Sequence, residues 1–220
     1  MTTNIALFGG VYSNYLALDA AITDARSRGI SDLYCLGDLG AFGPFPDRIF
    51  PLLQRHNVQC IQGNYDDSIG NELNNCQCGY TDVRDNYYAN ISYQYTQQHT
   101  SADNKAFLRQ LPRTRIIQVE QTQILLCHGS PRKLNEFLWE STSPDHFLEP
   151  FFAQHNVDVI AVTHTGIKWQ RQLPSGLFVN VGVLGRPEND GTTNVWYTIL
   201  EVSGSKTAVE FVPIEYDYQQ

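Results

Sequence analysis

The sequence LYCLGD at residues 33–38 decides the fold class, because it is a short apolar run that ends in a glycine and an aspartate. Residues 32–36 have the composition of a β-strand, and residues 5–8 form a similar run near the start of the chain. Between these two runs, residues 15–28 place apolar side chains at helical spacing, and Gly29 then ends the helix. The order of strand, helix and strand predicts an α/β fold with a parallel sheet.

The rest of the chain continues this alternation and then changes character. Helices are expected at residues 46–55, 102–111 and 144–154, with some helix near 86–98 inside a polar excursion over residues 63–100. Strands are expected at residues 58–61, 116–119, 123–127, 157–162, 169–173, 177–181, 195–202 and 208–213. The close spacing of the last strands predicts a mainly antiparallel end of the chain. We expect one domain over residues 1–220.

Composition restricts the classes of partner. The 220 residues carry a formal net charge of -8 and only 15 Lys and Arg, so no nucleic-acid partner is expected. No apolar run is long enough for a membrane span and no signal-like segment is visible, which predicts a cytoplasmic protein without a membrane partner. Of five cysteines, Cys76 and Cys78 lie two residues apart, a spacing that we expect to disfavour an unstrained disulfide.

Four polar residues directly follow apolar strand-like runs. They are Asp38, Asn64, His128 and His164. Each residue alone is typical of a turn, a cap or a buried hydrogen bond. Together they stand where α/β sheets place their ligands, and two oxygens with two imidazoles suit Mn, Fe or Zn. We therefore predict that the four side chains converge on one site.

These residues also lie in motifs that resemble a known family. The motifs are Gly37-Asp38, GNYD at residues 63–66, HGSP at residues 128–131 and THT at residues 163–165. They resemble four of the five motifs of calcineurin-like metallophosphoesterases, with the YfcE-like bacterial phosphodiesterases as the most similar group. The resemblance implies an α/β fold of two β-sheets in a sandwich flanked by helices. It also implies two metal ions, bridged by the aspartate that corresponds to Asp38.

The chain departs from the family pattern at three ligand positions. Gly10, Tyr12 and Gly166 stand where the resemblance implies ligands, and all three losses fall on the same ion. The four retained residues correspond to ligands of the other ion. We expect one divalent metal ion (Mn, Fe or Zn), or no ion at all. Restoring Gly10→Asp, Tyr12→His and Gly166→His together is expected to recover the second ion if the backbone positions are unchanged.

Four further residues are candidates for the site. Tyr65 stands where many family members have a catalytic histidine, and Tyr12 is a candidate for the emptied half; we take both as the candidate catalytic residues. Asn14, which follows the altered first motif, and Arg132, which follows residues 128–131, are the candidate substrate-binding residues. An arginine there can meet a phosphate through its planar group, although an exposed loop charge is an equal reading.

Three functions remain open from the sequence. The first is a phosphoesterase with a reduced, single-metal site that hydrolyses a phosphodiester or phosphomonoester weakly. The second is an inactive or repurposed relative that binds a ligand or partner. The third is a mononuclear iron enzyme, since two histidines and a carboxylate also bind Fe(II). A small phosphorylated molecule is the expected ligand, and homo-oligomers remain open.

Overall fold

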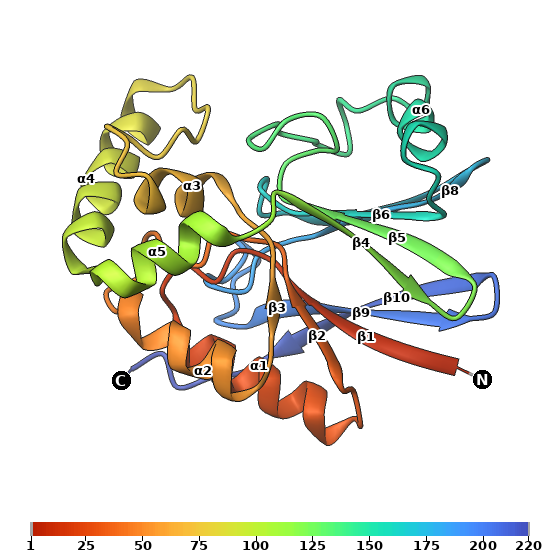
Figure 1. The fold of residues 1–220 in the computed structure, drawn as a ribbon, viewed down its shortest axis with the longest axis horizontal. Helices are drawn as coiled ribbons and strands as arrows, with labels where there is room; N and C mark the ends of the chain where they lie inside the picture. The colour runs from red at the N-terminus through yellow and green to blue at the C-terminus, as the bar shows by residue number, and fades with distance from the viewer. Residues whose placement is uncertain (1, 220) are drawn as a thin grey trace.

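Two five-stranded sheets form the centre of the molecule (Figure 1). The computed structural model describes residues 2–219. The first sheet has the order β10-β9-β1-β2-β3 and the second the order β4-β5-β6-β8-β7. The strands of the first sheet are β1 (Thr2–Phe8), β2 (Asp32–Cys35), β3 (Gln59–Cys60), β9 (Val195–Ser203) and β10 (Lys206–Ile214). Those of the second are β4 (Thr114–Val119), β5 (Thr122–Cys127), β6 (Val159–Val162), β7 (Lys168–Leu173) and β8 (Gly176–Val181). The predicted two-sheet sandwich is confirmed.

Each sheet has a parallel part. Strands β1, β2 and β3 run parallel, with Ile5 opposite Asp32, and β5, β6 and β8 run parallel in the other sheet. The expectation of a mainly antiparallel end is confirmed, with one exception. The pairs β7–β8, β9–β10 and β1–β9 are antiparallel, and β8 also pairs in parallel with β6. Local spacing predicts hairpins, whereas the second partner of β8 depends on the packing of the whole sheet.

The core contains three apolar clusters, and two of them lie on opposite faces of β1. Ile5 and Leu7 of β1 face the space between the sheets, where they join Leu126 of the second sheet in one apolar cluster. Ala6 and Phe8 face the opposite side and belong to the cluster under the helices. Side chains of a strand alternate between faces, so a strand that is buried on both faces is apolar throughout. This explains the uninterrupted apolar run at residues 5–8.

Helices cover the outer faces of both sheets (Figure 1). Helices α1 (Tyr15–Ser27) and α2 (Ile49–Arg55) lie on the first sheet, and α6 (Asp145–His155) lies on the second. The predicted helix over 46–55 divides into a 3-10 turn, η1 (Pro46–Arg48), and α2. Among residues 2–219, no helix is long and apolar enough to cross a membrane.

The polar excursion and the helix that follows it form a third group of helices at one end of the molecule (Figure 1). These helices are α3 (Asn64–Gly70), α4 (Val83–His99) and α5 (Ala102–Gln110). Helix α4 includes the stretch predicted near 86–98, and it buries only Ala89, Tyr93 and Thr96. Helix α3 was not predicted, because its sequence NYDDSIG is short and has no apolar periodicity. It lies directly after β3, where it positions part of the site.

Candidate metal site

Two polar side chains from each sheet meet at the carboxyl ends of four strands. Asp38 follows β2, and Asn64 begins α3 just after β3. His128 follows β5 and His164 follows β6. The Nε2 atom of His128 lies 3.1 Å from Oδ1 of Asn64 and 3.1 Å from Nδ1 of His164. The same nitrogen lies 3.3 Å from Oδ2 of Asp38, and all four residues are buried. The structure thus brings together the four residues that the strand-end pattern indicated.

The atoms that face one another in this cluster are nearly all acceptors. Nδ1 of His128 lies 2.7 Å from the carbonyl oxygen of Leu36 and donates to it, so Nε2 of the neutral imidazole carries a lone pair. Nδ2 of Asn64 donates to the carbonyl oxygen of Cys76 at 2.9 Å, which turns Oδ1 toward His128. Protons satisfy such a set only in part, whereas one divalent cation satisfies every lone pair at once.

The pKa shifts of Asp38 and His164 favour a cation. Burial and the charge of His128 lower the pKa of His164 to about 3, so this imidazole is neutral at pH 7. Burial acts to raise the pKa of Asp38, but the two histidines outweigh it and the pKa falls below the usual value. Burial acts to lower the pKa of His128, and Asp38 raises it overall. The carboxylate of Asp38 and the neutral imidazole of His164 are the forms in which these groups bind metal ions, whereas the raised pKa of His128 means that an ion has to displace a proton from its Nε2.

The donor set fits a divalent ion. One ligand atom from each of Asp38, His128 and His164 can be chosen so that all three lie within 4.8 Å of one another. Oδ1 of Asn64 adds a fourth, neutral oxygen beside His128. Two oxygens and two imidazole nitrogens make a four-ligand set that suits Zn, Mn or Fe. The residues present therefore fit the ion that the sequence predicts, although their role as ligands stays a prediction.

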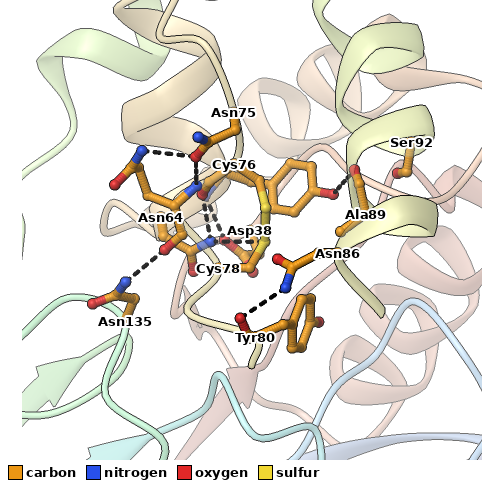
Figure 2. Close-up of a disulfide and its surroundings, with 12 residues drawn as sticks. Asp38, Asn64, Asn75, Cys76, Cys78, Tyr80, Asn86, Ala89, Ser92 and Asn135 are labelled. Carbon is orange, nitrogen blue, oxygen red and sulfur yellow. Dashed lines mark hydrogen bonds between the residues drawn. A yellow bond between two sulfur atoms is a disulfide. The ribbon is translucent and has the colours of Figure 1, made fainter. Parts of the chain in front are cut away.

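A disulfide segment orients Asn64 (Figure 2). Cys76 and Cys78 form a disulfide, and Asn64 Nδ2 lies 3.5 Å from Sγ of Cys78 as well as near the Cys76 carbonyl. The disulfide forms although the spacing of the two cysteines was expected to disfavour an unstrained one. Gln77 has a φ of 53°, which bends the chain so that the two cysteine Cα atoms are 5.3 Å apart, an ordinary separation for a disulfide. Nδ2 of Asn135 donates to the Gln77 carbonyl at 2.6 Å, so the second sheet's loop anchors the segment too.

Asp66 holds the loop that carries Asp38. Its carboxylate accepts the backbone N–H groups of Asp38 at 2.7 Å, Leu39 at 2.9 Å and Gly63 at 2.8 Å. In turn, the N–H of Tyr65 donates to Oδ1 of Asp38 at 3.0 Å. Burial and the charge of Asp38 raise the pKa of Asp66 to about 6. This network fixes the orientation of the Asp38 carboxylate relative to α3.

The backbone of the cluster is unusual at three points. Asp38 and His164 have φ values of 55° and 62°, in the left-handed region that is uncommon for residues other than glycine, although Asp and His adopt it more often than most. A Cβ on Gly63 would come within 2.4 Å of the Asp38 nitrogen and 3.0 Å of Cε1 of His128, so only glycine fits between them. Strained conformations of this kind persist where the surrounding structure enforces them, and they gather at functional sites.

Two side chains fill the part of the site around Gly10, Tyr12 and Gly166, where the resemblance implies the ligands of a second ion. A Cβ on Gly10 would lie 2.6 Å from Cε1 of Tyr12, so the Tyr12 ring occupies the space of any side chain at position 10. A Cβ on Gly166 would lie 3.1 Å from Nη2 of Arg186, and Gly166 has a φ of 78°. Burial and the charge of Asp38 raise the pKa of Tyr12 well above its usual range, so its phenol stays protonated. An aromatic ring and a guanidinium group therefore stand where the resemblance implies a second ion.

The Tyr65 hydroxyl points toward α4. It donates to the carbonyl oxygen of Ala89 at 3.2 Å, and its ring packs against Tyr93 at a centroid distance of 6.0 Å. Burial raises the pKa of Tyr65 above its usual range, so the phenol keeps its proton. Its backbone N–H, by contrast, contacts Asp38 directly. A catalytic role for Tyr65 stays a prediction, and the observed contact is one of packing.

The two predicted substrate-binding residues have protein partners. Asn14 accepts the N–H of Ala17 at the start of α1, and its Nδ2 donates to the carbonyl oxygen of Gly185 at 3.0 Å. Arg132 is exposed and pairs with Glu136, with Nε 2.9 Å from Oε2. Asn14 thus joins α1 to the loop after β8, and Arg132 belongs to a surface ion pair. Substrate contact by either residue stays a prediction.

Two residues of the site were missed by the sequence reasoning. Asp66 had a local signal, since an acid three residues after Gly63 matches the capping pattern of a helix start. Arg186 had no such signal. It lies 20 positions after Gly166, and the two come together only because β6 pairs with β8 and the loops after these strands become neighbours.

Comparisons with known proteins agree with this arrangement. A family model described as the calcineurin-like phosphoesterase superfamily domain matches residues 4–205. The chain is 26% identical over 231 residues to the uncharacterized protein MJ0912 of Methanocaldococcus jannaschii, a match that covers 98% of this chain and 89% of that protein. The chain therefore belongs to the calcineurin-like phosphoesterase superfamily, as the motifs predicted.

Two solved structures share the fold. The hypothetical protein PH1004 of Pyrococcus horikoshii OT3 superposes with a TM-score of 0.79 at 20% identity, covering 99% of this chain and 90% of that one. A metallophosphoesterase from Sphaerobacter thermophilus superposes with a TM-score of 0.70 at 23% identity, with the same coverage of 99% and 90%. At these identities the likeness is one of fold, and the chemistry rests on this chain's own residues.

Proposed function

We propose that this chain is a phosphoesterase that works with one divalent metal ion held by Asp38, Asn64, His128 and His164. The observation that supports this most is the set of facing acceptor atoms around Nε2 of His128. Membership of a phosphoesterase superfamily supports the reaction class. Manganese, iron and zinc all match the ligand set. The substrate is then a small phosphomonoester or phosphodiester.

Each residue has a part that follows from its contacts. When bound, a divalent ion polarises a phosphoryl oxygen and lowers the pKa of a coordinated water. Leu36 fixes the tautomer of His128 through the Nδ1 hydrogen bond, as partners of metal-binding histidines commonly do. Asp66 and the N–H of Tyr65 hold the Asp38 carboxylate in place. Because Tyr12 and Arg186 fill the other half, we expect slow turnover, with esters of good leaving groups hydrolysed best.

The filled half-site also favours a second candidate, a relative that binds a phosphorylated ligand without hydrolysing it. The buried phenol of Tyr12 has a raised pKa and lacks the chemistry of the ligands it replaces. The intact cluster around His128 favours the enzyme instead. Burying four polar groups that face one another costs free energy of folding unless a bound ion compensates them. The mononuclear iron enzyme has the same three ligand residues and no further support.

A metal count and a hydrolysis assay test the proposal together. The protein is loaded separately with Mn, Fe(II) and Zn, the ions per chain are counted by mass spectrometry, and hydrolysis of bis(p-nitrophenyl) phosphate and p-nitrophenyl phosphate is followed. We expect one ion per chain and slow hydrolysis that a chelator removes. Asp38→Asn is the matched variant, and it should lose both the ion and the activity. Hydrolysis that survives the chelator and Asp38→Asn would contradict the proposal, and one bound ion without hydrolysis would favour the binding relative.

A further inference from the structure

A pocket of about 450 Å³ opens beside the candidate metal site. His164 belongs to both, since its ring lines the pocket while its Nδ1 faces His128. Tyr12 and Arg186 line the same pocket, so it borders the filled half of the site. A molecule in this pocket would lie next to an ion held by the His128 cluster.

Arg186 is the basic residue in the pocket wall, and unlike three basic residues elsewhere it has no acidic partner in the part of the chain that the structure describes. Arg132 pairs with Glu136, Lys168 with Glu188, and Arg171 with Asp145. Within residues 2–219, the ion pairs and hydrogen bonds found in the structure include none made by the Arg186 side chain. Its Nη2 lies close to Gly166, on the pocket wall. An exposed, unpaired guanidinium group beside a phosphoesterase site has its planar donors available for a phosphate.

Part of the pocket wall is aromatic. The Phe137 and Trp139 rings are parallel, with an interplanar angle of 2° and centroids 5.5 Å apart. Phe137 also packs on His164 at 4.3 Å and near Tyr80 at 5.8 Å. Trp139 is 37% exposed, so a flat ring can stack on this platform from the pocket side. Aromatic side chains in such a position stack on the face of a ligand ring, and this contact does not depend on hydrogen bonds to the polar groups at the edge of the ring.

Charge limits how many phosphoryl groups the pocket can take. Two carboxylates, Asp82 and Asp85, also line it. Asp82 accepts the N–H groups of Arg84 and Asp85 at the start of α4, at 2.8 and 3.2 Å. With one unpaired cation and two carboxylates, the pocket suits a ligand with a single phosphoryl group and disfavours a polyphosphate, whose extra charges would meet Asp85.

We propose that this pocket binds a phosphate ester that has one phosphoryl group and an aromatic ring, the class to which nucleoside monophosphates belong. The phosphate lies against Arg186 next to the metal site, and the ring stacks on Trp139 and Phe137. Arg186 thereby supplies part of the positive charge that a second ion would give. This inference rests on the proposed function, because it concerns the substrate class of the same site. It concerns binding and adds no chemical step.

Binding of two small probes tests the proposal. Phenyl phosphate and ethyl phosphate are titrated calorimetrically into the metal-loaded protein and into the chelated protein. We expect phenyl phosphate to bind at least about tenfold more tightly than ethyl phosphate, which lacks a ring to stack. Arg186→Gln should weaken both probes about tenfold or more, since it removes a charged donor. Trp139→Ala should weaken phenyl phosphate and leave ethyl phosphate unchanged.

Arg84→Gln is the charge-matched control, because Arg84 is exposed near the pocket and is not part of its wall. It should leave the affinity for both probes within about twofold. Thermal unfolding checks that each variant is folded. Equal affinity for the two probes would overturn the aromatic part, and an unchanged affinity in Arg186→Gln would overturn the role of Arg186. The metal count and the chelator-sensitive hydrolysis are measured on the same samples, so failure of the proposed function is seen separately from failure of this pocket.

Discussion

The two halves of the site differ in what surrounds their backbone. Around Asp38, buried hydrogen bonds support the backbone, from the three N–H groups held by Asp66 to the disulfide segment beside Asn64. Around Gly10, the space is filled by the Tyr12 ring. A half-site that had only lost its ligands would leave room for an ion with other donors. Because a protonated phenol and a guanidinium group stand there instead, we expect that occupancy by side chains, more than ligand loss, keeps a second ion out.

The largest effect is expected from His128→Ala, which removes the nitrogen at the centre of the retained half. Metal affinity should fall by more than about 100-fold, because even the partners that only orient a ligand contribute 10–100-fold. Equilibrium dialysis with Zn or Mn measures the loss. Tyr12→Phe is the control, and it should bind the ion as the wild type does. A comparable loss in Tyr12→Phe would show that the phenol is a ligand and that the two halves are not separate.

Asp66→Ala should cost about 3 kcal/mol or more in the free energy of unfolding. It leaves three buried N–H groups without an acceptor, each of which costs about 1–3 kcal/mol. Urea unfolding measures the change. The neighbouring acid Asp67 is the control, since its ion pair with Arg113 spans 3.6 Å at the surface and its loss should cost under about 1 kcal/mol. An equal loss of unfolding free energy in the two variants would show that the hydrogen bonds of Asp66 stabilise the protein no more than a surface ion pair does.

Reduction of the disulfide, or Cys76→Ser with Cys78→Ser, should lower metal affinity about tenfold. The change frees the segment that fixes the Asn64 amide, and loss of such an orienting contact has an effect of this order. Metal titrations of oxidised and reduced wild type measure it. A reducing agent should have no effect on the double variant, which serves as the control. An unchanged metal affinity on reduction would show that the backbone of α3 alone orients the Asn64 amide.

The smallest effect is expected from restoring the missing ligands. Gly10→Asp with Tyr12→His and Gly166→His should leave the count at one ion per chain, contrary to what the sequence suggested. That expectation assumed an unchanged backbone, but Gly166 has a φ of 78° and the Arg186 guanidinium lies 3.1 Å from its Cβ position. Mass-spectrometric metal counts test this. Two ions per chain would mean that the filled half opens easily and that the two halves differ only in their ligands.

Much of the site could be predicted because its signals are local. Asp38 and His128 each follow an apolar strand directly, and a strand end is visible in a single window of sequence. Comparison with the family motifs then indicated that ligands are missing at Gly10 and Gly166. Helix α3 was missed because seven residues without apolar periodicity give no helical signal, and its formation depends on Asp66 folding back onto Gly63. The Cys76–Cys78 disulfide was missed because the backbone bend at Gln77 cannot be read from spacing.

The sequence by itself determined which residues can bind a metal ion, because residue type and strand-end position set the available ligand chemistry. It also determined which ligands are absent, at Gly10, Tyr12 and Gly166. Only the tertiary structure decided what replaced them. Arg186 reaches the emptied half because β6 and β8 are parallel neighbours, and the aromatic wall at Phe137 reaches His164 from a separate loop. Such contacts join residues far apart in the chain, and they depend on how the two sheets pack, which no local pattern encodes.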